Sequence, residues 1–191
     1  MIQETEKQQL RLEAKQIRAG ASKMLGFKAS EQATTHGLTL LSSFEKGAII
    51  AGYWPIGDEL DPRFLLHTLE RRNFKLALPV ITGKDKPLAF RLWGNGDPLE
   101  KGPFGTLQPP GDAPLVTPHV LLAPLLAFDA DCYRLGWGGG FYDRTLALNT
   151  SIKAFGFAYA AQYVEHIPRS SYDWPMQGII TEAGVVLPKV Q

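Results

Sequence analysis

The segment from Tyr133 to Leu146, YRLGWGGGFYDRTL, restricts the fold more than any other part of the chain, because four of its fourteen residues are glycine. A glycine inside a regular helix or strand costs roughly 0.5–1 kcal/mol, so four could cost about 2–4 kcal/mol. That is a sizeable part of a typical unfolding free energy of about 5–15 kcal/mol. Since a turn between a strand and a helix needs only one or two glycines, the excess indicates main-chain N–H groups that a ligand approaches closely.

The glycines join a predicted strand to a helix that we expect to begin at about residue 139. Free N–H groups and the dipole at a helix N-terminus favour an anion, typically phosphate. Neither standard motif fits, because Phe141 stands where a Walker A loop has lysine and where the dinucleotide fingerprint has glycine. The flanking side chains of Arg134 and Arg144 could bind phosphate oxygens. A purely structural turn is the alternative interpretation.

Acidic residues in two segments are further candidates. Asp143 is either an ordinary first-turn acid of the predicted helix or a magnesium ligand that offsets phosphate charge. The segment YWPIGDELD follows the first predicted strand, at the edge where open parallel sheets bind ligands. Its acids Asp58, Glu59 and Asp61 either form a site or belong to a loop or helix cap, and Trp54 either stacks on a flat ring or joins the core.

Strands alternate with helices along the chain, which predicts an α/β fold with a mostly parallel sheet flanked by helices. The predicted helices cover 3–25, 29–45 and 62–72, with a fourth from about 139. The predicted strands lie at 47–55, 74–78, 88–92, 119–129 and 153–159, with a terminal pair within 178–187. Asp61 is a possible N-cap of the helix that Pro62 begins. The first helix is an N-terminal extension whose basic face carries Lys7, Arg11, Lys15 and Arg18, and the simplest interpretation of this face is that it is solvated.

Composition narrows the class of protein. The 191 residues suit a single α/β domain spanning 1–191. A net charge of +1 gives no reason to expect a nucleic-acid or membrane partner. Cys132, the single cysteine, excludes an internal disulfide and is interpreted as a buried thiol, and it favours a cytoplasmic location. The four histidines lack the spacing of metal ligands.

The glycine block resembles the 5-formyltetrahydrofolate cyclo-ligase family, also called 5,10-methenyltetrahydrofolate synthetases. The likeness rests on APLLAFDADCYRLGWGGGFYDRTL and is supported by KQQLR near the start, by YWPIGDELD and by GIITE near the end. The four segments stand in the family's order and span nearly the whole chain. The resemblance implies a fold similar to ribose-5-phosphate isomerase and the coenzyme A transferases. It also implies the Mg²⁺-assisted conversion of 5-formyltetrahydrofolate and ATP to 5,10-methenyltetrahydrofolate, ADP and phosphate.

The resemblance also implies roles for individual residues. The residues expected to bind nucleotide are Lys7, Arg11, Arg134, Leu135, Gly136, Trp137, Gly138, Gly139, Gly140, Phe141 and Tyr142. The residues expected to bind the folate are Arg11, Trp54, Glu59, Trp137, Gly138, Gly139, Gly140 and Phe141. Arg134 and Tyr142 are expected to be catalytic, Asp143 to bind metal, and Phe104 is a further candidate for stacking on the folate.

The chain departs from the family pattern at two places. Cys132-Tyr133 replaces a glycine before Arg134, and Gln177 replaces an acid that follows Asp173. The loss of this acid favours a rival interpretation, a non-catalytic nucleotide-binding module on the same fold. A third interpretation, a sugar-phosphate isomerase or a transferase, rests on fold analogy alone. The expected assembly is a monomer or a weak homodimer.

Overall fold

The computed structural model describes residues 2–189 and contains one eight-stranded sheet in the order β12-β11-β10-β7-β1-β2-β3-β6. The five strands from β11 to β2 are mutually parallel, and β12, β3 and β6 add antiparallel edges. The strands are β1 (Ile49–Ala51), β2 (Lys75–Ile81), β3 (Leu88–Leu92), β6 (Leu115–Val116), β7 (Val120–Ala123), β10 (Lys153–Phe157), β11 (Gly178–Thr181) and β12 (Gly184–Val186). The predicted mostly parallel α/β fold is confirmed.

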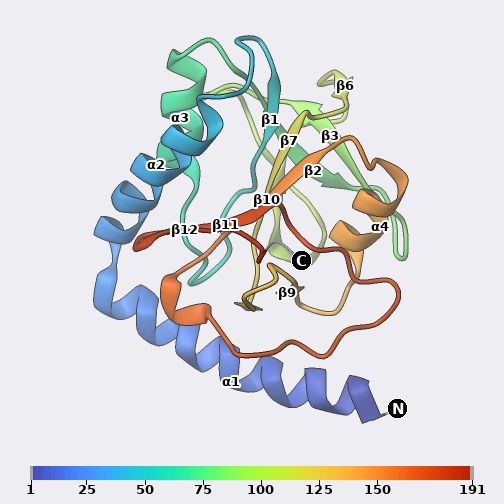
Figure 1. Ribbon diagram of the computed structural model, residues 1–191. Coiled ribbons are helices and arrows are strands. Elements are labelled where there is room, and N and C mark those ends of the chain that lie inside the picture. Colours follow the sequence, from blue (N-terminus) through green and yellow to red (C-terminus); the bar gives the residue numbers. More distant parts are fainter. Residues whose placement is uncertain (1, 190–191) are drawn as a thin grey trace.

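Helices cover both faces of the sheet (Figure 1). Side chains alternate along each strand, so Val120 and Leu122 of β7 pack on the side of α2 (Phe27–Leu41) and α3 (Arg63–Arg71). Leu121 and Ala123 pack on the opposite side, with α4 (Phe141–Leu148). All four side chains are buried, which explains why this strand has a continuous apolar sequence instead of an alternating one.

The N-terminal helix α1 (Ile2–Leu25) runs along one end of the molecule and reaches beyond the sheet (Figure 1). Its inner side carries Ala14, Arg18 and Ala21, all nearly inaccessible to solvent. The predicted helix is therefore confirmed, but the prediction of a solvated basic face is wrong. Arg18 is buried among the apolar positions, whereas Ile17, which was expected in the apolar stripe, is partly exposed.

Several predicted boundaries need correction. The predicted strand 119–129 divides at Pro124 into β7 and β8 (Ala127–Phe128), and β8 pairs with β9 (Arg134–Leu135) in a separate hairpin. Pro62, and not Asp61, is the N-cap of α3, although the Asp61 carboxylate accepts the Arg63 N–H. The terminal strand pair is confirmed as β11 and β12.

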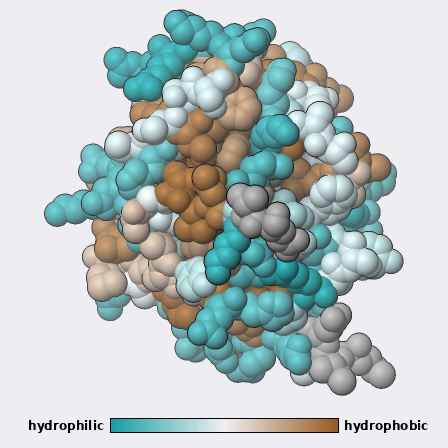
Figure 2. All heavy atoms as spheres, viewed as in Figure 1, coloured by the Kyte–Doolittle hydropathy of each residue, from teal (hydrophilic) through white to brown (hydrophobic). Residues whose placement is uncertain are grey.

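The proline-rich region between β2 and β7 extends one edge of the sheet with β3 and β6. Besides β3 and β6 it contains a small hairpin of β4 (Glu100–Lys101) and β5 (Leu107–Gln108), with the 3-10 turn η1 (Pro103–Gly105) at its tip. A second 3-10 turn, η2 (Ala160–Gln162), follows β10 and contacts α1. Figure 2, viewed from the same direction as Figure 1, shows a largely hydrophilic surface with a hydrophobic patch near the centre of the view. Among residues 2–189, no helix has the length and apolar character needed to cross a membrane.

Candidate active site

The glycine segment forms a loop between β9 and α4. Gly138 has a φ of +99° and Gly140 a φ of +64°, conformations that glycine adopts without the penalty a Cβ would bring. Gly140 is the N-cap of α4, and no side chain caps this helix end. The first N–H groups of α4 therefore remain available to a ligand.

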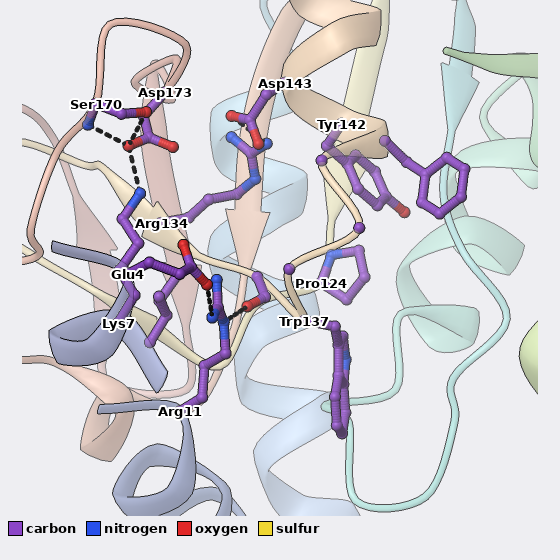
Figure 3. Close-up of a pocket in the computed structure, with 16 residues that line it drawn as sticks. Glu4, Lys7, Arg11, Pro124, Arg134, Trp137, Tyr142, Asp143, Ser170 and Asp173 are labelled. Atoms are coloured by element: carbon purple, nitrogen blue, oxygen red, sulfur yellow. Dashed lines mark hydrogen bonds and ion pairs between the residues drawn. The ribbon is translucent and has the colours of Figure 1, made fainter. Parts of the chain in front are cut away.

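A first cavity of about 280 Å³ opens over this loop. Every residue expected to bind nucleotide lines it, from Lys7 and Arg11 on α1 to Tyr142 on α4, and so does Asp143 (Figure 3). The structure therefore brings the expected residues of the N-terminal helix next to those of the glycine loop. The sequence interpretation did not include the lining residues Glu4, Pro124 and Ser170, and it mentioned Asp173 only as a retained motif acid.

Ion pairs cross the first cavity. The ammonium of Lys7 lies 2.6 Å from Asp173, and Arg134 lies 2.8 Å from Asp143. Arg11 binds Glu4 at 2.9 Å and donates from Nε to the carbonyl of Gly136 at 3.1 Å (Figure 3). Each of the three cations is thus paired with an acid that also lines the cavity.

The same contacts set the charge of Asp173. Burial alone would raise the pKa of this carboxyl group. The Lys7 ammonium and the Ser170 N–H outweigh burial, so the pKa of Asp173 lies below its ordinary value. The carboxylate therefore stays charged and can hold Lys7 in place.

A second cavity, of about 420 Å³, lies against the other side of the loop. Trp54, Glu59, Trp137, Gly139 and Phe141 line it, as expected for residues that contact the folate, and Phe104 also lines it. The remaining expected folate contacts, Arg11, Gly138 and Gly140, line the first cavity only. The other lining residues, which sequence reasoning missed, are mostly apolar: Tyr53, Ile56, Pro79, Ile81, Leu88, Thr106, Leu107 and Pro124.

Glu59 is the acidic group of the second cavity. Its side chain is 4% exposed, and Oε2 accepts the Ile56 N–H at 2.9 Å. Burial raises the pKa of Glu59, against the Ile56 hydrogen bond and the charge of Arg18, whose guanidinium nitrogen lies 3.6 Å from Oε1. Glu59 is therefore a buried acid in a mostly apolar cavity, with few hydrogen-bond partners.

The two cavities share a wall. Pro124, Trp137, Gly139, Phe141 and Tyr142 line both. Burial raises the pKa of Tyr142 above its ordinary value, so the phenol stays protonated and can donate a hydrogen bond. A group bound in one cavity can therefore react with a group bound in the other beside this phenol.

Three other candidates lie outside both cavities. Arg144 donates to the carbonyls of Gly139 and Lys86 and therefore braces the loop, so the prediction that it reaches phosphate is not supported. The Gln177 side chain, just before β11, accepts the N–H of Ala154 in β10. Cys132 is fully buried and burial raises the pKa of its thiol to about 11, as expected of a structural thiol.

The cavities lie where the parallel strands end, since Tyr53 and Trp54 follow β1 and Pro124 follows β7. An anion site built of main-chain amides and cations adjoins an apolar site with one buried acid. This arrangement defines a class of α/β protein that brings a phosphorylated ligand to a second, largely apolar small molecule.

The sequence model of the 5-formyltetrahydrofolate cyclo-ligase family matches residues 3–182, and the chain belongs to this family. The 5-formyltetrahydrofolate cyclo-ligase of Haemophilus influenzae is 34% identical over 91% of this chain and 96% of its own. The Escherichia coli K12 protein of the same name is 32% identical over 71% of this chain and 79% of its own.

Solved structures agree with this assignment. The 5,10-methenyltetrahydrofolate synthetase of Aquifex aeolicus superposes with a TM-score of 0.79 and is 28% identical, covering 97% of this chain and 94% of its own. The corresponding protein of Mycoplasma pneumoniae has a TM-score of 0.72 at 24% identity, over 92% of this chain and 98% of its own, and supports the fold alone.

Proposed function

We propose that the chain uses its two cavities for the ATP-dependent cyclisation of 5-formyltetrahydrofolate to 5,10-methenyltetrahydrofolate, with release of ADP and phosphate. Family membership supports the reaction. The observation that carries the assignment of the cavities is their common wall of Trp137, Gly139, Phe141 and Tyr142. Because the two cavities adjoin at these residues, the terminal phosphate of ATP in one cavity would lie close to the formyl oxygen of the folate in the other.

The chemistry explains why a phosphate site and a folate site must adjoin. A formamide is a poor electrophile, and its oxygen is a poor leaving group. Phosphorylation of that oxygen makes it a good leaving group, so that N10 of the folate can close the ring as phosphate departs. Phosphoryl transfer depends mainly on positioning and on neutralising charge, and less on covalent help from the protein.

The first cavity supplies this neutralisation in our proposal. The main-chain amides from Gly136 to Gly140 and the first turn of α4 hold the phosphates. Lys7, Arg11 and Arg134, each already paired with an acid that lines the cavity, add positive charge. Arg134 and Tyr142 are the proposed catalytic residues, because both line the cavity and Tyr142 also faces the folate side.

Mg²⁺ fits the first cavity as a partner of ATP. Within residues 2–189 no cluster of three or more His, Cys, Asp or Glu side chains forms a complete metal site. Magnesium usually takes one or two carboxylates, water and the substrate's phosphates as ligands. Asp143 lines the cavity with 26% of its side chain exposed and would supply a carboxylate. Bound magnesium would neutralise phosphate charge.

The second cavity would hold the folate. Glu59 would accept hydrogen bonds from the N–H groups of the pterin. Trp54, at the side of the cavity, has its ring edge-on to Trp93 at 6.0 Å between centroids and could contact the ring system. Phe104, which is 76% exposed at the tip of the β4–β5 hairpin, would cover the opening.

One assay tests the proposal. The protein is mixed with ATP, Mg²⁺ and 5-formyltetrahydrofolate, and the absorbance of 5,10-methenyltetrahydrofolate is followed. Absorbance should rise, and omitting ATP should abolish the rise. Nucleotide binding without product would instead support the non-catalytic module. The absence of an acid at position 177 is weak support for that module, because Gln177 is bonded to β10 and lines neither cavity. The monomeric or weakly dimeric state, the single domain, the cytoplasmic location and the lack of nucleic-acid or membrane partners stay predictions.

A further inference from the structure

Arg18 is the most deeply buried cation of α1 and has no role in the assignments above. Its side chain is 3% exposed. Nε and one terminal nitrogen both donate to Oδ1 of Asp58, at 2.9 and 2.5 Å. The other terminal nitrogen is buried, has no hydrogen-bond partner within residues 2–189, and points at Oε1 of Glu59 from 3.6 Å.

This arrangement is costly for a residue that only fills space. A buried guanidinium loses its hydration, and a buried nitrogen without a hydrogen bond adds to that loss. An apolar side chain would fill the same place between α1 and the core at lower cost. The partly unsatisfied arginine therefore indicates a task that requires its charge.

The task lies at Glu59, the acid of the folate cavity. The Ile56 N–H donates to one Glu59 oxygen, the Trp137 side chain is a further hydrogen-bond partner of the carboxylate, and Oε1 faces Arg18. The remaining groups around this carboxylate provide no further cation: Asp58 is a second anion, Tyr53 and Tyr142 are neutral phenols, and Trp137 is an indole. Lys15 lies over the Trp137 ring, with its ammonium 4.6 Å from the ring centre.

Arg18 also touches the wall between the two cavities. Its guanidinium lies 5.2 Å from the centre of the Trp137 ring, on which Lys15 stacks as well. Arg18 thus contacts Asp58, Glu59 and Trp137, and the last two of these line the folate cavity. One side chain of α1 can therefore set both the position and the charge of the folate-binding acid.

We propose that Arg18 is a positioning residue for the folate site, which holds Glu59 as a fixed anionic acceptor and supports Trp137 beside it. The proposal rests on the function proposed above for Glu59. Arg18 lines neither cavity. Its effect on folate binding therefore passes through the two lining residues that it contacts, chiefly the Glu59 carboxylate and also Trp137.

The test compares Arg18→Met, Arg18→Lys and Glu59→Gln. Arg18→Met should raise the KM for 5-formyltetrahydrofolate about tenfold, the size expected for a weakened charged hydrogen bond, with the KM for ATP unchanged. Without the guanidinium, Glu59 protonates at higher pH, so the acidic limb of kcat/KM for the folate should move up by about one pH unit. Arg18→Lys should restore the acidic limb and part of the KM. Arg91→Met, outside both cavities, is the matched control.

A double variant separates positioning from a merely structural role. If Arg18 acts through Glu59, Arg18→Met should add little to the folate KM in the Glu59→Gln background. A KM and pH profile unchanged by Arg18→Met, while Glu59→Gln alone raises the KM, would overturn the proposal. The proposal would also be overturned if Arg18→Met raised the KM for both substrates equally, Arg18→Lys did not lower either KM again, and the effect were the same in the Glu59→Gln background. A folate KM unchanged in Glu59→Gln would show instead that the assignment of Glu59 itself is wrong.

Discussion

At the scale of single residues, burial and neighbours decide which acids of the site are charged. Asp173 and Glu59 are both carboxylates in cavities, but their pKa values move in opposite directions. Asp173 has a lysine and two donors of Ser170 close by, so its pKa is lowered despite burial. Burial prevails at Glu59 and raises its pKa, because the Ile56 N–H, the charge of Arg18 and the Trp137 side chain offset it only in part. Residue type alone could not predict this difference.

Glu59→Gln should therefore separate folate binding from ATP binding. Glutamine keeps the size of the side chain but offers one neutral acceptor oxygen in place of two charged ones. We expect the KM for 5-formyltetrahydrofolate to rise about tenfold or more, and the KM for ATP to stay unchanged. Steady-state kinetics with each substrate varied in turn measure both values, and an unchanged folate KM would contradict the prediction.

The same variant should be more stable than the wild type at neutral and higher pH. Because the pKa of Glu59 is raised in the folded protein from its ordinary 4.5, the folded state keeps this proton over a pH interval in which the unfolded state has lost it. Wild-type stability therefore falls as pH rises through that interval, and Glu59→Gln escapes this loss. Melting temperatures of both proteins should be measured from pH 4 to pH 8. Above about pH 4.5, the melting temperature of Glu59→Gln should exceed that of the wild type by a margin that grows with pH. A wild type that is more stable than Glu59→Gln at pH 8 would contradict this prediction.

Cys132 offers a second test at a single residue. Its φ is +61°, in the left-handed region that costs a side chain with a Cβ about 1–2 kcal/mol. Here the chain has Cys132-Tyr133 in place of the family's glycine. Cys132→Gly should be more stable than Cys132→Ala by about 1 kcal/mol, because only glycine is free of this strain.

Chemical unfolding of both variants measures the difference. Gly20 supplies the control, because its added Cβ would meet no atom within 4 Å and its φ is not left-handed. There, in the helix α1, alanine should be the more stable residue. An alanine preference at both positions would show that the left-handed conformation of Cys132 carries no measurable cost.

At the scale of elements, patterns predict what an element is more reliably than what it contacts. The periodicity of residues 3–25 predicted α1, but it could not show that Arg18 faces the core, because periodicity does not identify a partner. The excess of glycine predicted the loop before α4, since only this residue tolerates the φ values of Gly138 and Gly140. The hairpin that carries Phe104 could not be predicted, because its strands have two residues each and their pairing depends on distant contacts.

The loop itself can be tested with a matched pair of glycines. An added Cβ would meet no atom within 4 Å at Gly136, which lines the first cavity, or at Gly111, which does not, and neither glycine has a left-handed φ. Gly136→Val should weaken ATP binding at least tenfold, about 1.4 kcal/mol, because its side chain crowds the approach to the loop amides. Gly111→Val should bind ATP normally.

Both variants should keep their stability within about 0.5 kcal/mol of the wild type. Titration calorimetry and thermal unfolding measure the two effects separately. Gly139 is a poorer choice, because its added Cβ would lie 2.9 Å from the Phe141 ring and disturb the wall between the cavities. Normal ATP affinity in Gly136→Val would contradict a phosphate site at this loop.

At the scale of the whole molecule, the site depends on joining distant parts of the chain. Lys7 and Asp173 stand 166 positions apart and meet at the first cavity, and Arg11 reaches the loop at Gly136 over 125 positions. Three of the four motif segments, KQQLR, YWPIGDELD and the glycine segment, contribute lining residues to the two cavities, and KQQLR does so because α1 crosses the end of the sheet (Figure 1). The rest of the fold supplies the loop, Arg134 and the buried acid, and α1 supplies Lys7 and Arg11.

ATP binding should therefore order α1 together with the body of the protein. Hydrogen exchange should slow on adding ATP and Mg²⁺ at residues 4–11 and 170–173 as well as 136–143, because all three segments line one cavity. At 100 times its Kd, ATP should stabilise the fold by about 2.7 kcal/mol, and Lys7→Ala should weaken binding about tenfold and remove the protection of α1. Lys23→Ala, at the exposed far end of the helix, should change neither. Protection confined to 136–143 in the wild type would show that α1 contributes structure but no contact to the nucleotide.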